Sequence, residues 1–496
     1  MPDAAQSFLS KLGIRPGLWV DGQWNEGGAE TLDVRNPATG IPITSVPLAG
    51  PGDFRHAIDG ASRAFESWRR EPNASRGNIL KKAAALMAAR RQELAEILTR
   101  EQGKPLAQAL AEVDYAASFF QWFGEESRRL SGRLQPHPQD GREYLIRHAA
   151  AGVAGLVTPW NFPIAQGAKK VAAALAAGCT AVWKPSELTP LSALALGPLL
   201  KEAGLPDGVL QILPALGPVA GEALSSDPRV RVLSLTGSTN TGRTLMKAAA
   251  RHLPRLSLEL GGNAPFLLLP DADLDFAAAD LVKLKLLCSG QVCVTANRVF
   301  VPASLESAFL EKLSSLWCNL SVGDGLAAGV DVGPLIHGKA CERVQGMVED
   351  AVRAGAEVVC ENRSHEGDPA LSAGSFFAPI ILRGVRDEMR VAQEEVFGPV
   401  LPLFSYDDLT DAIRRANATP FGLAAYVYGS DLSQANSVAH ALEAGIIGVN
   451  EWRPLRAEIP FGGMKYSGLG REGGPEGIHE FCDVKVIATA ASKPWA

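Results

Sequence analysis

Two cysteines five positions apart, in the stretch CSGQVC, could do chemistry by their type and spacing. A cysteine thiolate is both a nucleophile and a metal ligand. A zinc site needs about four ligands, however, and no histidine lies between His252 and His337. The chain has 7 cysteines with irregular spacing, which is unlike a disulfide framework. We therefore expect free thiols, and for Cys288 and Cys293 a nucleophilic role and a buried structural role are both open.

Polar side chains follow several predicted strands, where they could bind a ligand. The strand predicted at 152–157 is followed by TPWNFP, and the strand at 180–184 ends in KPSE. Asn161 offers two amide donors near a helix start, although a turn or cap role is equally open for it. Lys184 and Glu187 suit the hydroxyls of a ribose. Glu259 lies in LELGGN, where burial would raise the pKa of its carboxyl or require a partner.

The turn TGSTNTG follows the strand predicted at 230–235. A glycine-bearing turn between a strand and a helix presents backbone N–H groups and the helix dipole to an anion. The spacing matches neither of the common phosphate-loop patterns. A plain turn therefore remains open for this stretch.

Alternating strands and helices must position these side chains. Helices are predicted at 78–102, through YAASFFQWFGEESRRL with its aromatic residues in the core, at 163–177 before Gly178, from the cap Thr189 to Gly204, and from Gly242. Further strands are predicted at 209–213, 256–260, 265–269, 298–301 and 400–404. The alternation predicts an α/β fold with a doubly wound parallel sheet and a second α/β domain. Such sheets bind nucleotides at the carboxyl ends of their strands.

Size and charge limit the class of protein. A chain of 496 residues is long enough for two domains. The net charge of -6, without a basic stripe, argues against a nucleic-acid partner. The longest nearly apolar run, at 171–183, is too short to cross a bilayer, and the first residues lack a secretory signal. We expect a cytoplasmic protein without a membrane partner.

Seven stretches together resemble one family over essentially the whole length: TPWNFP, KPSE, TGSTNTG, LELGGNAP, SGQVC, EEVFGPV and PFGGMKYSGLGRE. The chain resembles the aldehyde dehydrogenases. Three further stretches, EVDYAASFFQWFGEESRRLSG, ALAAGCTAVWKP and GREGG, are most similar to the succinate-semialdehyde dehydrogenase branch. The resemblance implies an NAD-binding domain at 1–129 and 150–261, and a catalytic domain at 262–462. It also implies a small β oligomerisation arm and tail at 130–149 and 480–496, and a homodimer or homotetramer.

The resemblance assigns the catalytic roles. Cys293 is the implied nucleophile, which forms a thiohemiacetal and then a thioester with the aldehyde carbon. The Asn161 amide and the Cys293 backbone N–H are the implied oxyanion donors. Glu259 is the implied general base that activates water, which disfavours a coenzyme-A-acylating enzyme. Lys170 and Glu472 are expected to pass the proton onward.

The resemblance also implies a nicotinamide cofactor. Glu187 is expected to bind the ribose 2′-hydroxyl and repel a 2′-phosphate, so NAD is predicted to be preferred, with NADP possible. The implied cofactor-binding residues are Thr158, Trp160, Lys184, Glu187, Gly237, Ser238, Glu395 and Phe397.

The sequence departs from the branch at the substrate end. The branch holds its substrate carboxylate with two arginines, and Leu287 and Lys169 stand at those positions. Leucine cannot pair with a carboxylate, and lysine lacks arginine's two-pronged geometry. In the loop at 450–456, Arg453 or Arg456 would replace the missing charge, or Trp452 would line a pocket for a bulky aldehyde. An ω-semialdehyde acid and a larger or aromatic aldehyde are therefore both open.

Two further hypotheses remain. A non-catalytic NAD-binding protein is disfavoured because Cys293, Glu259 and Asn161 are all present. Under oxidation, Cys288 would cap Cys293 reversibly as a disulfide. Gly290 is expected to give the cysteine loop the conformational freedom to present the thiol.

Overall fold

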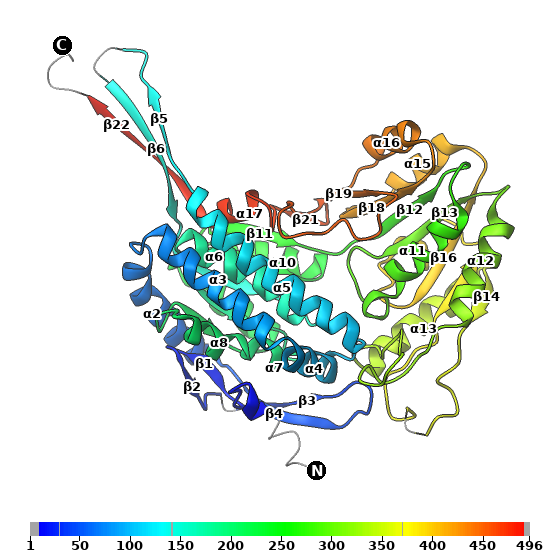
Figure 1. Ribbon diagram of the computed structural model, residues 1–496, viewed down its shortest axis with the longest axis horizontal. Coiled ribbons are helices and arrows are strands. Elements are labelled where there is room, and N and C mark those ends of the chain that lie inside the picture. The colour runs from blue at the N-terminus through cyan, green and yellow to red at the C-terminus, as the bar shows by residue number, and fades with distance from the viewer. Residues whose placement is uncertain (1–8, 29, 140–141, 370, 491–496) are drawn as a thin grey trace.

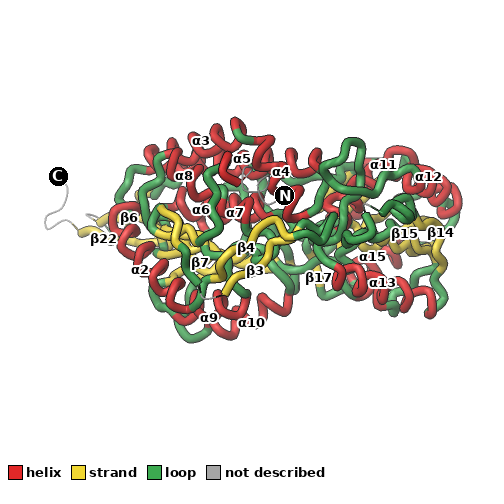
Figure 2. Tube along the Cα trace, turned by 90° about the horizontal axis from the view of Figure 1, so that it is seen from below, coloured by secondary structure: helices red, strands yellow, loops and turns green. Residues whose placement is uncertain are grey.

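Two mostly parallel sheets, each covered by helices on both faces, make up most of the molecule (Figure 1). The computed structural model describes residues 9–28, 30–139, 142–369 and 371–490. Figure 2 shows helices above and below the strands in both halves. The predicted α/β class is confirmed.

The first sheet has eight strands, of which the five in the middle run parallel. In spatial order they are β2 (Gln23–Asn25), β1 (Leu18–Val20), β9 (Leu210–Ile212), β8 (Thr180–Lys184), β7 (Val153–Val157), β10 (Val230–Thr236), β11 (Arg255–Glu259) and β21 (Gly468–Leu469).

Alternate side chains of this sheet enter two separate cores. One core lies under α3 (Asn73–Ala89), α4 (Arg91–Gln102), α5 (Leu106–Glu126), α6 (Pro163–Ala177), α7 (Leu191–Leu194) and α8 (Leu196–Ala203). The other lies under α2 (Pro51–Trp68), α9 (Gly217–Ser226) and α10 (Thr239–Ala249). On β8, Trp183 packs in the first core and Val182 in the second. Burial on both faces explains why these strands are nearly continuous apolar runs.

The second sheet has seven strands, in the order β14 (Glu357–Glu361), β15 (Ile380–Arg383), β16 (Val400–Tyr406), β13 (Ala296–Pro302), β12 (Ala264–Leu268), β18 (Ala424–Tyr428) and β19 (Ile446–Val449). Helices α11 (Leu274–Leu286) and α12 (Glu306–Cys318) pack in the core of one face. Helices α13 (Gly338–Arg353), α15 (Leu409–Asn417) and α16 (Leu432–Ala441) pack in the core of the other. The turn η2 (Leu287–Gly290) follows α11 directly.

A third sheet of three strands, β22 (Cys482–Ala490), β6 (Arg142–Ala150) and β5 (Arg133–Pro136), projects from the body (Figure 1). Apart from Ala150, its strands lie within the residues predicted as arm and tail, 130–149 and 480–496, of which residues 140–141 and 491–496 lie outside the described residues. The remaining elements are short: β3 (Glu30–Arg35), β4 (Pro42–Leu48), η1 (Ser127–Arg129), α14 (Arg390–Gln393), β17 (Phe421–Gly422), β20 (Met464–Lys465) and α17 (Glu476–His479). The predicted domain boundaries stay a prediction.

Three predicted helices were wrong in their limits. The helix at 78–102 is divided into α3 and α4 at Arg90, which has φ -108° and ψ 24°. Arg90 pairs with Glu202 and Arg91 with Asp114, so the two consecutive side chains bond to different helices. The helix ending at Gly204 is divided into α7 and α8, and α10 begins before its predicted start at Gly242.

Glu101, not Thr189, caps α7. Its carboxylate accepts hydrogen bonds from the backbone N–H groups of Leu191 and Ser192, at 2.8 and 2.9 Å. The Thr189 hydroxyl instead faces the carbonyl oxygen of Trp160 at 3.5 Å. Across the described ranges, no helix is both long and apolar enough to cross a membrane.

Candidate active site

The predicted nucleophile follows a turn with unusual backbone geometry. In η2, Cys288, Ser289 and Gly290 have φ of 50°, 56° and 76°. A left-handed conformation costs a non-glycine residue about 1 kcal/mol or more. A Cβ on Gly290 would overlap the carbonyl oxygen of Gly398, so glycine is required there for both space and conformation. This turn presents Cys293.

Hydrogen bonds from distant parts of the chain hold this turn. They are Cys288 N–H to Gln108 Oε1 at 2.8 Å, Ser289 Oγ to the Gly333 carbonyl at 2.8 Å, and Ile336 N–H to Gln291 Oε1 at 3.0 Å. The Gln291 amide also donates to the Cys288 carbonyl at 3.0 Å. The geometry of the turn therefore depends on α5 and on the segment before α13.

Two clefts meet at Cys293. One, of about 670 Å³, has mainly apolar walls: Tyr115, Phe162, Ala165, Gln166, Lys169, Leu284, Leu287, Val292, Cys293, Val294, Tyr426, Trp452, Arg453, Leu455 and Phe461. The other, of about 820 Å³, is lined by Pro159, Trp160, Asn161, Gln166, Thr236, Gly237, Ser238, Leu260, Gly261, Cys293, Arg343, Glu395 and Phe397. We call them the apolar cleft and the strand-end cleft. Cys293 is thus accessible from two sides.

The Cys293 thiol lies in an environment that disfavours its charge. Burial, and then the negative charges of Glu395 and Glu259, raise its pKa to about 12, against the lowering effect of Lys169. A thiol with this pKa holds its proton at neutral pH. A base must therefore remove that proton when the sulfur attacks.

Asn161 lies between the thiol loop and the strand-end cleft. Its Nδ2 donates to the Gln291 carbonyl at 2.8 Å, which uses one of its two amide hydrogens. Its Oδ1 is buried and has no hydrogen-bond partner among the described residues. The second amide hydrogen is available to a ligand beside Cys293.

Glu259, Lys170 and Glu472 form a buried cluster at the end of β11. Both carboxylate oxygens of Glu259 lack a hydrogen-bond partner within the described part of the chain. Burial, followed by the charge of Glu472, raises the pKa of Glu259 well above its usual value. Lys170 Nζ contacts Glu472 Oε1 and donates to Ser234 Oγ at 2.8 Å. These groups could take and relay a proton.

The strand-end cleft contains most of the predicted cofactor residues. Trp160 and Phe397 meet edge to face with ring centroids 5.5 Å apart. Glu395 Oε1 accepts from the Gly262 N–H at 3.2 Å, and burial raises the pKa of Glu395 to about 7. Ser238 caps α10 by accepting from the Thr241 N–H. Trp160 and Ser238 follow the carboxyl ends of the parallel strands β7 and β10, whereas Glu395 and Phe397 come from the loop before β16.

Three predicted cofactor residues are not among those that line this cleft. Lys184 and Glu187 pair with each other at 2.6 Å at the end of β8. The Thr158 hydroxyl accepts from Trp183 Nε1 at 2.9 Å, which leaves its side chain in a structural contact.

A nicotinamide dinucleotide fits these residues. The strand-end cleft lies over the turn between β10 and α10, where backbone N–H groups favour an anion. Its wall includes Thr236, whose buried hydroxyl has no hydrogen-bond partner in the described residues. The Trp160 and Phe397 rings offer apolar faces next to Cys293.

The apolar cleft contains four of the five predicted substrate residues: Lys169, Leu287, Trp452 and Arg453. Arg456 is not among the residues that line this cleft, is exposed, and donates to the Leu455 carbonyl.

Lys169 is a buried cation in the wall of the apolar cleft. Its Nζ lies 3.8 Å from the ring centroid of Phe461 and 5.6 Å from that of Tyr115. Its nearest carboxylate, on Glu472, is 4.0 Å away. Burial lowers its pKa, but Tyr115 and the surrounding acidic groups outweigh this and raise it. Lys169 therefore stays charged with room for a further anionic partner.

Several lining residues were not predicted. Tyr115, in the aromatic segment predicted to pack in the core, lines the apolar cleft. Its neighbours Phe119, Phe120 and Phe123 do pack in the core. Arg343 of α13 lines the strand-end cleft and donates to the backbone carbonyl of Glu395. Tyr115 lies in a helical pattern of aromatic and apolar residues, and nothing in that pattern indicates that its side chain would face a cleft.

Residues 24–487 match the model of the Aldehyde dehydrogenase family. The chain belongs to this family, as its motifs predicted, and it is an NAD(P)-dependent oxidoreductase that acts on an aldehyde.

Among its relatives, the NADP(+) succinate-semialdehyde dehydrogenase GabD of Escherichia coli (strain K12) is 45% identical, covering 94% of this chain and 96% of that protein. A glutarate-semialdehyde dehydrogenase of Pseudomonas aeruginosa is 43% identical over 96% of this chain and 97% of that protein. A crystal structure described as an E. coli NADP dependent enzyme superposes with a TM-score of 0.94, at 44% identity, covering 97% of this chain and 99% of that one. The resemblance to the succinate-semialdehyde branch is confirmed.

Proposed function

We propose that this chain oxidises an aldehyde to a carboxylic acid by covalent catalysis at Cys293. The observation that carries this proposal is that Cys293 lines both clefts. A thiol in that position meets an aldehyde from the apolar cleft and a nicotinamide from the strand-end cleft. Cys288, by contrast, is buried and its thiol lies against Gln102 and the Asn161 carbonyl.

In the first half of the reaction, Cys293 Sγ gives its proton to a solvent base that reaches it through the clefts, and the sulfur bonds to the aldehyde carbon. The carbonyl electron pair moves to the oxygen, where the Asn161 amide and the Cys293 N–H stabilise the negative charge. The residues of the strand-end cleft would hold NAD(P), which would supply the acceptor for the hydride that leaves this carbon. The carbon then remains on Cys293 as a thioester.

In the second half, Glu259 removes a proton from a water molecule whose oxygen attacks the thioester carbon. The carbon–sulfur bond breaks, and the carboxylic acid leaves. The contact of Lys170 with Glu472, and the charge that Glu472 exerts on Glu259, support a path for the proton away from the site.

Replacement of the nucleophile tests this mechanism. Cys293→Ala is expected to reduce aldehyde-dependent NADH formation to the uncatalysed level, because no thioester can form. Cys288→Ser is the matched control and is expected to keep activity within a few-fold of wild type. Aldehyde oxidation by Cys293→Ala would contradict the proposal.

We propose further that the substrate is a short ω-semialdehyde acid. Lys169 is a buried cation on the wall of the apolar cleft, and the partly buried Arg453 adds a second positive charge. Tyr115 lies beside Lys169, and its hydroxyl could donate to a carboxylate as well. The names of the relatives, which include succinate- and glutarate-semialdehyde dehydrogenases, agree with this class.

The apolar walls favour a second candidate, a larger or aromatic aldehyde. Leu287, Trp452 and Phe461 present hydrophobic surface to the cleft. Values of kcat/KM for succinate semialdehyde, glutarate semialdehyde, benzaldehyde and a long alkanal separate the two candidates. We expect the acids to be preferred, and a Lys169→Met variant to lose that preference while still oxidising benzaldehyde. Equal values for acids and neutral aldehydes in wild type would eliminate the first candidate.

We also propose that NAD is preferred over NADP, that the enzyme forms a homodimer or homotetramer, and that it works in the cytoplasm. The carboxylate of Glu187 supports the first of these. The projecting three-stranded sheet supports the second.

A further inference from the structure

The structure assigns a positioning role to the buried ion pair of Lys104 and Glu112, which we infer to set the Asn161 amide against the cysteine loop. The inference rests on the proposed function, because it concerns the oxyanion donor of that reaction. Neither Lys104 nor Glu112 is among the described residues that line the two clefts. Their effect on the reaction must therefore pass through the residues that they hold.

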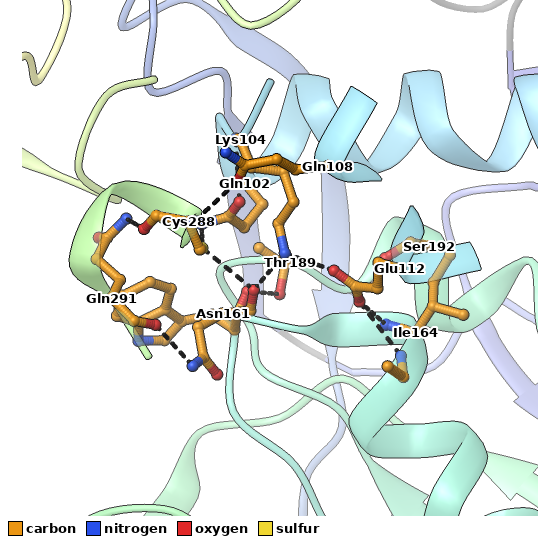
Figure 3. A network of polar contacts seen from close by, with 12 residues as sticks. Gln102, Lys104, Gln108, Glu112, Asn161, Ile164, Thr189, Ser192, Cys288 and Gln291 are labelled. Atoms are coloured by element: carbon orange, nitrogen blue, oxygen red, sulfur yellow. Dashed lines mark hydrogen bonds and ion pairs between the residues drawn. The ribbon is translucent and has the colours of Figure 1, made fainter. Parts of the chain in front are cut away.

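The first contact fixes the backbone of Asn161. Lys104 Nζ donates to Glu112 Oε2 at 2.5 Å and to the Asn161 carbonyl oxygen at 2.7 Å, as Figure 3 shows. The same ammonium lies 3.8 Å from the ring centroid of Phe162. Both side chains of the pair are fully buried. The Lys104 ammonium thus contacts two consecutive residues, Asn161 and Phe162, of the loop that follows β7.

The second contact fixes the start of α6. Glu112 Oε1 accepts from the backbone N–H groups of Ile164 and Ala165, at 3.1 and 3.2 Å. A carboxylate at a helix N-terminus satisfies donors that have no partner within the helix. Because Lys104 holds residue 161 and Glu112 holds residues 164 and 165, the pair clamps the whole turn from β7 into α6.

The same part of the chain also holds the cysteine loop. We call residues 102–112 the α4–α5 corner. From this corner, Gln102 Nε2 donates to Cys288 Sγ at 3.2 Å, and Gln108 Oε1 accepts from the Cys288 N–H. The Cys288 thiol in turn donates to the Asn161 carbonyl at 3.5 Å. The oxyanion donor and the nucleophile loop therefore both form hydrogen bonds with the α4–α5 corner (Figure 3).

A buried ion pair is a poor device for stability alone. Desolvation of two charges offsets their attraction, and apolar replacements of similar volume are often neutral or stabilising. An ammonium that holds a backbone carbonyl has fixed geometry, however, which an apolar side chain cannot provide. The contacts of this pair are therefore better explained by the position that they give to Asn161.

A double-mutant cycle on hydride transfer tests the inference. The rate of the NADH burst is measured by stopped flow for wild type, Glu112→Gln, Asn161→Ala and the double variant. Loss of one oxyanion donor costs about 100-fold to 1000-fold, so Glu112→Gln, which only displaces the donor, is expected to cost about 10-fold to 100-fold. In the Asn161→Ala background the same substitution is expected to change the rate less than about 3-fold.

Glu101→Gln is the matched control. Glu101 is equally buried and also caps a helix, but that helix is α7. Glu101→Gln is expected to lower the melting temperature. Its effect on the burst rate is expected to be the same in the wild-type and Asn161→Ala backgrounds. Glu112→Asp keeps the negative charge and is expected to have a burst rate between those of wild type and Glu112→Gln. If Glu112→Gln folds poorly, Glu112→Asp takes its place in the double-mutant cycle.

Equal losses from Glu112→Gln in the two backgrounds would overturn the inference, since they would indicate a general structural effect. This outcome differs from failure of the proposed function. If Asn161→Ala and Cys293→Ala both retained the full burst, the mechanism itself would be wrong, whereas slow Asn161→Ala without coupling removes the positioning role alone.

Discussion

The two cysteines of the opening stretch have different surroundings although they are five residues apart. Cys288 has left-handed backbone geometry and a buried thiol that contacts Gln102 and the Asn161 carbonyl. Cys293 lines both clefts. The hypothesis of a reversible disulfide between them stays a prediction. Peroxide inactivation that dithiothreitol reverses in wild type but not in Cys288→Ser would support it.

Protonation of Glu259 should control the pH dependence of turnover. Burial and the charge of Glu472 raise the pKa of Glu259. Its side chain therefore loses its proton only at a pH well above that at which a glutamate ordinarily ionises. Steady-state kcat is therefore expected to rise with pH through the raised pKa when thioester hydrolysis limits the rate. Glu259→Gln should remove this limb and leave the NADH burst in place. A pH profile that is unchanged in the variant would exclude Glu259 as the base.

Glu259 should also make the free energy of unfolding depend on pH. A carboxyl whose folded-state pKa is raised favours the folded state below its unfolded pKa, and this contribution is lost as pH rises through the folded value. The free energy of unfolding of Glu259→Gln is therefore expected to increase relative to wild type between acidic and alkaline pH. Urea titrations at several pH values measure the difference, and a constant difference would contradict it.

Glu187 should control cofactor choice. Glu187→Gln removes the carboxylate that a 2′-phosphate would face and frees Lys184 from its 2.6 Å ion pair. The ratio of kcat/KM for NADP to that for NAD is expected to rise about 10-fold, which corresponds to about 1.4 kcal/mol. Steady-state kinetics with both cofactors measure the ratio, and wild type is expected to prefer NAD. A ratio that does not change would show that the 2′ position lies elsewhere.

At the scale of elements, the sequence predicted strands and helices well where the signals were local. The bounds predicted for β8 and α6 match the structure, because α6 has proline in its first turn and Gly178, at φ 94°, after its last. The prediction failed where a distant residue decides the outcome. Glu101 caps α7 from about 90 positions away, and the predicted helix is interrupted at Arg90, whose side chain pairs with Glu202 of α8.

The candidate site divides in the same way. Cys293, Asn161 and Glu259 follow strands or motifs. Cys293 and Asn161 line the strand-end cleft, whereas Glu259 is not among the described residues that line either cleft, although its charge acts on the Cys293 thiol. Three other residues also line the clefts: Tyr115 from the middle of α5, Phe461 from the loop before β20, and Arg343 from α13. Nothing in their local sequence indicates that direction, since it is set by the packing of elements far apart in the chain.

The turn η2 should tolerate no side chain at residue 290. Gly290→Ala would put a methyl group against the Gly398 carbonyl in a left-handed backbone. We expect a loss of about 1 to 3 kcal/mol of stability and a larger loss of activity. Gly221→Ala is the control, because a Cβ at that helical position meets no atom of the described residues within 4 Å. It should be neutral or slightly stabilising in urea denaturation.

At the scale of the whole molecule, the projecting sheet exposes apolar side chains. Val484 and Val486 of β22 are 60% and 58% exposed, and Leu134 of β5 is 64% exposed. Surfaces of this kind mark protein interfaces. Size-exclusion chromatography with light scattering is expected to show a dimer or tetramer for wild type and a smaller species for Val484→Asp/Val486→Asp. A monomeric wild type would contradict the proposed homo-oligomer.

Three consecutive left-handed residues in the turn before Cys293 make the conformation of the nucleophile a cooperative property of the fold. The turn is held by hydrogen bonds with Gln108 of α5 and with Gly333 and Ile336 of the segment before α13. We expect that loosening either part would release the turn to ordinary backbone angles while the two sheets stay intact. Mild heat or denaturant should therefore abolish catalysis before circular dichroism records any loss of secondary structure.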